Sequence, residues 1–179
     1  PSLVGSEMCI RDRVYAPDWT TTERLDYTKQ LFDLMAELSP EGQAISVSTV
    51  PGSFKGFIKS ETRQEQHEAI YRNLTACADH IESLREKTGR DIHLGLEPEP
   101  LCLFETSEET IEFFDGYLSG RESDERSRIL SNIGVNYDTC HLAIEYEDPG
   151  ASVEVLLDAG IRISKIHLSS ALKLAPNPD

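Results

Sequence analysis

Short apolar segments alternate with amphipathic segments along the chain, and this alternation constrains the fold more than any other feature of the sequence. The apolar segments are bounded by turn residues, as buried strands are, and they cover residues 44–50, 92–98, 133–138 and 161–169. Apolar residues recur at helical spacing before the first strand and between consecutive strands. This order predicts parallel β-α-β units whose sheet is covered by helices.

The ends of the expected helices carry capping and breaking residues. A long helix over residues 62–88 is followed by Gly89, a residue suited to a helix C-cap. Asp148 and Pro149 open a later helix, and Gly160 ends it. Further helices are expected over residues 20–38, from Ser107 to Leu118, and near Ile129.

The strand ends favour a barrel over a nucleotide-binding sheet. None of the four strands is followed by a glycine-rich phosphate fingerprint. A complete (β/α)8 barrel needs about 250 residues and about eight strands, whereas this chain has 179 residues. We therefore expect an α/β fold, a partial (β/α)8 TIM barrel with about four parallel βα units over residues 14–179 of a truncated chain.

The first 13 residues do not read as the start of a domain. The opening PSLVGSEMCIRDR has neither helical nor strand periodicity and no cap. It resembles an adapter-derived translation of the kind that recurs at the ends of assembled sequence contigs. We expect residues 1–13 to be a non-native segment, so Cys9 carries no argument.

The charge of the chain narrows the class of partner. With 17 Lys and Arg against 32 Asp and Glu, the formal net charge is −15, which weighs against nucleic acid and anionic membranes. No apolar run reaches the roughly 18 residues that a membrane span needs. The four cysteines are irregularly spaced without a CxxC pair, which favours reduced thiols and a cytoplasmic protein. A small-molecule metabolite is the expected partner, and the oligomeric state stays open.

Ionisable residues stand where three of the strands end. Strict alternation turns Glu97 and Asp138 toward the inside of a barrel, at the carboxyl ends of their strands. His141 follows in the next loop, and His167 ends the last strand. Parallel sheets place their ligand sites at this edge, so we expect these four side chains to converge.

The converging set suits a transition metal. Any one of these residues alone is more often a hydrogen-bonded rim residue or a helix cap, but carboxylates and imidazoles together favour Mn²⁺, Zn²⁺, Co²⁺ or Fe²⁺. Residues Ser53, Lys55 and Glu105 lie on rim loops, either in contact with a polar ligand or simply solvated. Glu99 lies two residues after Glu97, so strand alternation would put it on the same face. Because Pro98 separates the two, we expect Glu99 to be exposed.

Several segments resemble a known superfamily. LGLEPEP, VNYDTCHLAIEYEDP and ISKIHLSS resemble the xylose isomerase-like TIM barrels, which include sugar isomerases, epimerases and endonuclease-IV-type enzymes. The segments VYAPDWTTTERLDYTKQLFDLMAELSPEG and SVSTVPGSFKG are similar to the EboE branch of that superfamily, the metabolite traffic proteins. Together these segments cover nearly everything after residue 13.

The resemblance implies a role for each site residue. Glu97 would be a metal ligand and a proton-transfer base, and Asp138 and His167 would be metal ligands. His141 would contact substrate or act as a second ligand. Glu105 is an expected substrate contact because of its place on a rim loop, and not because of the resemblance. The last glutamate ligand of the family falls on a strand beyond Asp179, so we expect this chain to be an inactive fragment of a larger barrel.

Three functions follow from the resemblance. One is an isomerase or epimerase of the metabolite-traffic type, which removes a proton next to the carbonyl of a small polar, sugar-like metabolite while the metal polarises its oxygens. A second is a non-catalytic protein that binds or carries the metabolite. The third is a DNA-repair nuclease, which needs three metals and a basic groove and which the net charge of −15 disfavours.

Overall fold

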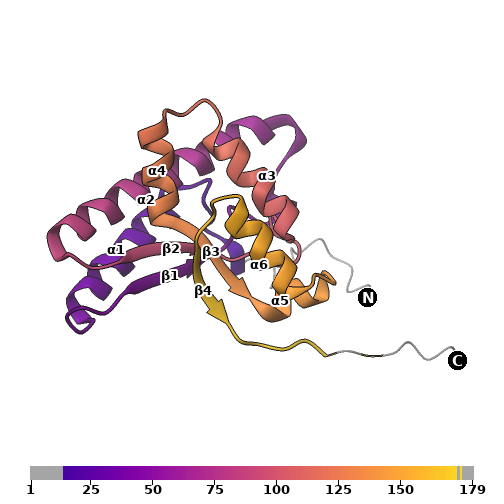
Figure 1. Ribbon diagram of the computed structural model, residues 1–179. Coiled ribbons are helices and arrows are strands. Elements are labelled where there is room, and N and C mark those ends of the chain that lie inside the picture. Colours follow the sequence, from indigo (N-terminus) through magenta and orange to yellow (C-terminus); the bar gives the residue numbers. More distant parts are fainter. Residues whose placement is uncertain (1–13, 173, 175–179) are drawn as a thin grey trace, which may run out of the picture.

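Four parallel strands form one open sheet, curved as half of a barrel (Figure 1). The computed structural model describes residues 14–172 and residue 174; the predicted non-native segment, residues 1–13, lies outside this range. The strands run in the order β1-β2-β3-β4, and each pair of neighbours is parallel. Their bounds are Ile45–Thr49 (β1), Ile92–Leu96 (β2), Ile133–Asp138 (β3) and Ile163–His167 (β4). The predicted partial TIM barrel is therefore confirmed.

Helices connect the strands and cover the outer face of the sheet. In the view of Figure 1, helices α2, α3, α4 and α6 lie above the strands. No helix of the described residues is long and apolar enough to cross a membrane. The helices are α1 (Thr22–Leu38), α2 (Arg63–Thr88), α3 (Ser107–Leu118), α4 (Ser123–Asn132), α5 (Thr139–Ile144) and α6 (Pro149–Asp158), with 3-10 turns η2 (Lys55–Phe57) and η3 (Ser60–Thr62).

The predicted capping residues act as expected. Gly89 ends α2 in the left-handed conformation, with φ of 66°. The side chain of Asp148 accepts a hydrogen bond from the Ala151 backbone N–H at the start of α6. One expectation was wrong: His141 lies in the short helix α5 and not in a loop, because Asp138 also caps the helix that follows it.

The outer face of the sheet forms the core with the helices, as the alternation predicted. Ile92, Leu94 and Val135 are fully buried on this face. The hydroxyl of Tyr137 hydrogen-bonds to Ser152 of α6 at 2.6 Å. An aromatic cluster fills the space between α2 and α3, and it consists of Tyr71, Phe104, Phe113, Phe114 and Tyr117.

The inner face is closely packed at two glycines. A Cβ atom on Gly95 would lie 3.0 Å from the Cβ of Asn136 on the neighbouring strand. On Gly134 it would collide with the backbone carbonyl oxygen of Arg162. Gly134 therefore requires glycine because of the close approach of the neighbouring strand, and a larger residue at Gly95 would need Asn136 to shift.

The pairing of β3 with β4 contains one irregularity. Val135 pairs with Ile163, but Asn136 pairs with Lys165, so Ser164 has no partner in the register. The hydroxyl of Ser164 instead donates to the carbonyl oxygen of Leu94, at 3.1 Å. This is a β-bulge, with one extra residue on β4.

His93 should make the stability of the chain depend on pH. It is 5% exposed, its Nδ1 has no hydrogen-bond partner among the described residues, and burial, followed by the charge of Arg162, lowers its pKa from 6.5 to about 4. Between pH 4 and 6.5, His93 is protonated in the unfolded state and neutral in the folded state. The free energy of unfolding should therefore rise with pH across this window, by up to about 3 kcal/mol.

The measurement is urea unfolding at a series of pH values from 4 to 7. The variant H93Q should lose this part of the pH dependence. The control H80Q should keep it, because His80 lies at the surface beside Asp33. An unchanged slope in H93Q would show that burial of the imidazole is not its cause.

Candidate metal centre

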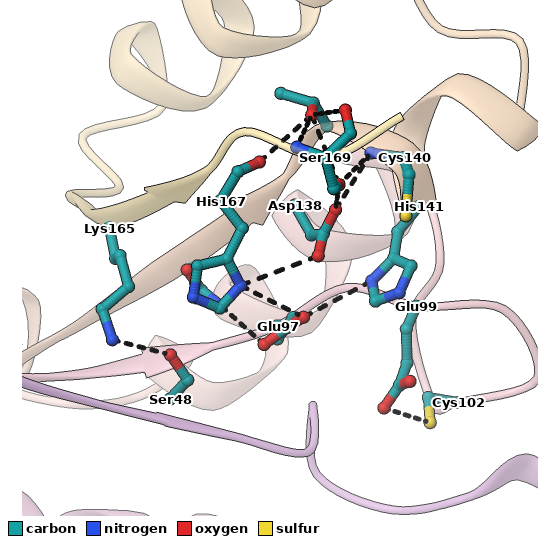
Figure 2. A network of polar contacts seen from close by, with 12 residues as sticks. Ser48, Glu97, Glu99, Cys102, Asp138, Cys140, His141, Lys165, His167 and Ser169 are labelled. Carbon is teal, nitrogen blue, oxygen red and sulfur yellow. Dashed lines mark hydrogen bonds and ion pairs between the residues drawn. The ribbon is translucent and has the colours of Figure 1, made fainter. Parts of the chain in front are cut away.

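Three neighbouring strands bring Glu97, Asp138 and His167 together at the carboxyl edge of the sheet (Figure 2). Glu97 follows β2 directly, and its backbone N–H extends the ladder by donating to Thr49. Asp138 and His167 are the last residues of β3 and β4 and pair in register. The Nδ1 atom of His167 lies 3.6 Å from Asp138 Oδ2 and 3.8 Å from Glu97 Oε1.

His141 approaches the same carboxylate from α5. Its Nδ1 atom lies 3.6 Å from Glu97 Oε1. This nitrogen is buried and has no hydrogen-bond partner among the described residues. Glu97 Oε1 therefore faces two imidazoles, those of His141 and His167. The four residues that the sequence singled out at the strand ends lie in one cluster.

Asp138 is held as a carboxylate. Burial works to raise its pKa, but hydrogen bonds from the Ser169 hydroxyl and from the backbone N–H of Cys140 outweigh burial, and the pKa lies below its usual value. Both hydrogen bonds go to Oδ1, and that from Cys140 is 2.9 Å long. The second oxygen, Oδ2, is the one that faces His167. Asp138 thus offers a charged oxygen to the centre of the cluster.

Asn136, on β3, contacts both Glu97 and His167. It is fully buried, and its Nδ2 donates to Glu97 Oε2 at 2.5 Å and lies 3.1 Å from His167 Nδ1. The other amide atom, Oδ1, has no partner among the described residues. The sequence placed Asn136 on the inner face but gave it no role. Asn136 and Asp138 lie two residues apart on one strand, so both side chains face the same side of the sheet. This spacing was the signal that could have identified Asn136 as part of the site.

The side chains fit a divalent metal ion. Ligands held about 2.1 Å from a tetrahedral metal lie about 3.4 Å apart, and the ion-pair distances around His167 are 3.6 and 3.8 Å. One oxygen or nitrogen each from Glu97, Asp138 and His167 lies within 4.8 Å of the others. Asp138, Cys140 and His141 form a second such group. Both groups include Asp138.

The rim-loop residues have other partners. Glu105 forms an ion pair with Lys55, whose ammonium also lies 3.2 Å from Glu109. The part of the chain that the structure describes has no hydrogen bond or ion pair between Glu105 and the metal-ligand candidates, and its substrate contact stays a prediction. Ser53 is not solvated but fully buried, with its hydroxyl donating to Asp18.

The expected exposure of Glu99 was wrong. Glu99 is half-buried, and burial raises its pKa. It accepts hydrogen bonds from the Tyr15 hydroxyl and the Cys102 thiol, both at 3.4 Å. The reason is the turn after β2, in which Leu101 has φ of 70°. The turn carries Cys102 back against Phe54, with which it forms an isolated bridge.

Comparison with known proteins agrees with this architecture. The family described as xylose isomerase-like TIM barrel matches residues 10–177. No curated protein is significantly similar to the chain. The family match spans all four strands and the candidate metal ligands Glu97, Asp138, His141 and His167. By this match, the chain belongs to the xylose isomerase-like TIM barrel family.

Proposed function

We propose that the protein is a metal-dependent isomerase or epimerase of the EboE metabolite-traffic type, which acts on a small polar, sugar-like metabolite. The observation that carries the proposal is the meeting of Glu97, Asp138 and His167 at the carboxyl edge of three adjacent strands. Oxygen and nitrogen ligands of this kind suit Mn²⁺, Zn²⁺, Co²⁺ or Fe²⁺.

Each residue has a distinct part in this proposal. Asp138 and His167 hold the metal, which when bound polarises the oxygens of the metabolite. Glu97 is a ligand and also moves a proton at the carbon next to the carbonyl. Asn136 fixes the Glu97 carboxylate through its 2.5 Å hydrogen bond. His141 contacts the metabolite from α5.

A non-catalytic protein that binds or carries the metabolite is the second candidate. One observation favours it: both oxygens of Glu97 already have neighbours. Oε2 accepts from Asn136, and Oε1 lies beside His141 and His167. A carboxylate so surrounded is well held as a ligand but has little freedom to take up a proton.

We also propose a cytoplasmic location. The cysteines of the described residues, Cys77, Cys102 and Cys140, are free thiols. Unpaired thiols of this kind are typical of a reducing compartment.

Deuterium exchange separates the two candidates. The full-length protein is freed of metal with a chelator, reloaded with Mn²⁺, and incubated with ketose sugars in D₂O. We expect deuterium to enter at the carbon next to the carbonyl, as followed by proton NMR, only with the metal present. The variant E97Q should lose this exchange, and the control E108Q, altered at an exposed residue of α3, should keep it.

The outcomes differ for each function. Metal binding without exchange for any sugar would support the non-catalytic candidate. Failure of the wild-type protein to retain any of the four metals after dialysis would exclude the metal-dependent isomerase or epimerase and leave the non-catalytic candidate, which does not require the metal.

A further inference from the structure

A cavity opens beside Glu97, on the side of the sheet nearest β1. Its volume is about 340 Å³, within the range of small-molecule sites. Glu97 lies in its wall, so the cavity and the metal-ligand cluster share one residue. The lining residues are Val14, Tyr15, Arg24, Ser48, Thr49, Val50, Glu97 and Glu99.

Arg24 is the cation in the wall of this cavity. It is half-buried in α1, and burial lowers its pKa. Its Nε donates to the carbonyl oxygen of Pro17 at 2.7 Å, which fixes the plane of the guanidinium. Within residues 14–172 and 174, it forms no ion pair with a carboxylate. The nearby Asp18 acts on its pKa, but that carboxylate accepts hydrogen bonds from Thr20 and Ser53.

The missing partner of Arg24 is not explained by a shortage of acids. The chain has 32 acidic and 17 basic residues. Of the half-buried arginines in the described residues, four form ion pairs with carboxylates and two, Arg24 and Arg90, do not; the four are Arg85, Arg121, Arg128 and Arg162. A partly desolvated cation without a counter-ion is unfavourable, which an anion in the cavity would relieve.

A second cation, Lys165 at the far edge of the sheet, contacts a residue of the cavity wall. The side chain of Lys165, on β4, crosses the inner face and donates to the Ser48 hydroxyl of β1 at 3.3 Å (Figure 2). Ser48 lines the cavity. Among the described residues, Lys165 also forms no ion pair with a carboxylate. One cation without a carboxylate partner, Arg24, therefore lines the cavity, and a second, Lys165, is bonded to a residue of its wall.

We propose that this cavity binds the oxyanion group of the metabolite, a phosphate or a carboxylate, with Arg24 as its main partner and Lys165 as the second. The Pro17 carbonyl uses only the Nε of Arg24, and the two terminal nitrogens of a guanidinium can bind an oxyanion with two hydrogen bonds. Glu97 and Glu99 also line the cavity, so the anion should lie beside Arg24 and away from their carboxylates. This inference rests on the proposed function for the rest of the metabolite, which lies toward Glu97.

Calorimetric titration tests the inference with matched probes. The probes are inorganic phosphate, D-ribulose, D-ribulose 5-phosphate and D-gluconate, each titrated into the metal-loaded protein. We expect D-ribulose 5-phosphate or D-gluconate to bind at least about tenfold more tightly than D-ribulose, since charge-assisted bonds are the strongest available. Tighter binding of D-ribulose 5-phosphate than of D-gluconate identifies the anion as phosphate, and the reverse identifies it as carboxylate. Inorganic phosphate measures how much the phosphate group contributes by itself.

The variants R24Q, R24K and K165M locate the effect. R24Q should abolish the preference for the charged probe, K165M should reduce it severalfold, and R24K should retain part of it because it keeps the charge but loses the fork. The matched control is R90Q. Arg90 also donates to a backbone carbonyl, that of Ala36, but it precedes β2 and lies at the opposite end of the sheet.

The results separate this inference from the proposed metal function. Equal binding of charged and neutral probes by the wild-type protein would overturn it, as would an unchanged preference in R24Q with a native circular dichroism spectrum. If R24Q does not fold, the other two variants replace it: an unchanged preference for the charged probe in both K165M and R24K would also overturn the inference. The double variant E97Q/D138N should lose the metal and still bind inorganic phosphate, so the metal site and the anion site can fail independently.

Discussion

Asparagine in place of Asp138 should lower the affinity of the chain for Zn²⁺ by at least about 100-fold, the upper end of what loss of an outer-shell partner costs. The Oδ2 atom of Asp138 faces His167, and the hydrogen bonds on Oδ1 keep the pKa low. An amide is neutral and a weaker metal ligand, so the substitution removes the charge without removing the shape. Competition with a fluorescent zinc chelator measures the affinity.

Asp148 supplies a matched control for this substitution. Both aspartates cap a helix: Asp138 accepts from the Cys140 backbone N–H, and Asp148 from that of Ala151, each at 2.9 Å. D148N should therefore share any loss of helix capping and leave zinc affinity unchanged. Equal zinc affinity in D138N and the wild type would remove Asp138 from the centre.

Alanine in place of Gly134 should destabilise the chain by about 3 kcal/mol. The new Cβ would collide with the carbonyl oxygen of Arg162, the same oxygen that accepts a 2.8 Å hydrogen bond from Val135 N–H. A backbone atom cannot move aside as a flexible side chain can. Because the contact joins β3 to β4, the substitution should also displace His167 and weaken metal binding. Urea unfolding measures the first effect.

Gly150 is the control for the added methyl group. Its Cβ would meet only the Asp148 side chain, at 3.3 Å, and it lies in the helix α6, where alanine is favoured over glycine. G150A should therefore be as stable as the wild type or more so. A loss of stability in G134A no larger than in G150A would contradict the close strand packing.

The sequence was sufficient to predict the strands and helices, because their apolar residues recur at a regular spacing. Alternation along β2 and β3 turned Glu97 and Asp138 inward, and helical spacing with Gly89 gave the bounds of α2 to within one residue. These features are set by neighbours along the chain. The convergence of the strand ends then followed from parallel pairing alone.

The parts that could not be predicted depend on contacts between distant segments. Glu99 is half-buried because a left-handed residue, Leu101, turns the chain back against Phe54. Ser53 is buried because Asp18, 35 residues earlier, accepts its hydrogen bond. Asn136 was placed on the correct face, but its role depends on partners from two other strands.

The extra residue in β4 makes the proposed metal centre sensitive to strand length as well as to residue type. Partners in register point to the same side of a sheet, and with Ser164 unpaired the partner of Asp138 is His167. Regular pairing counted from Ile163 would bring Ile166 opposite Asp138 instead. In evolution, the gain or loss of one residue in this strand can therefore place an apolar side chain opposite Asp138 while every candidate ligand remains in the sequence.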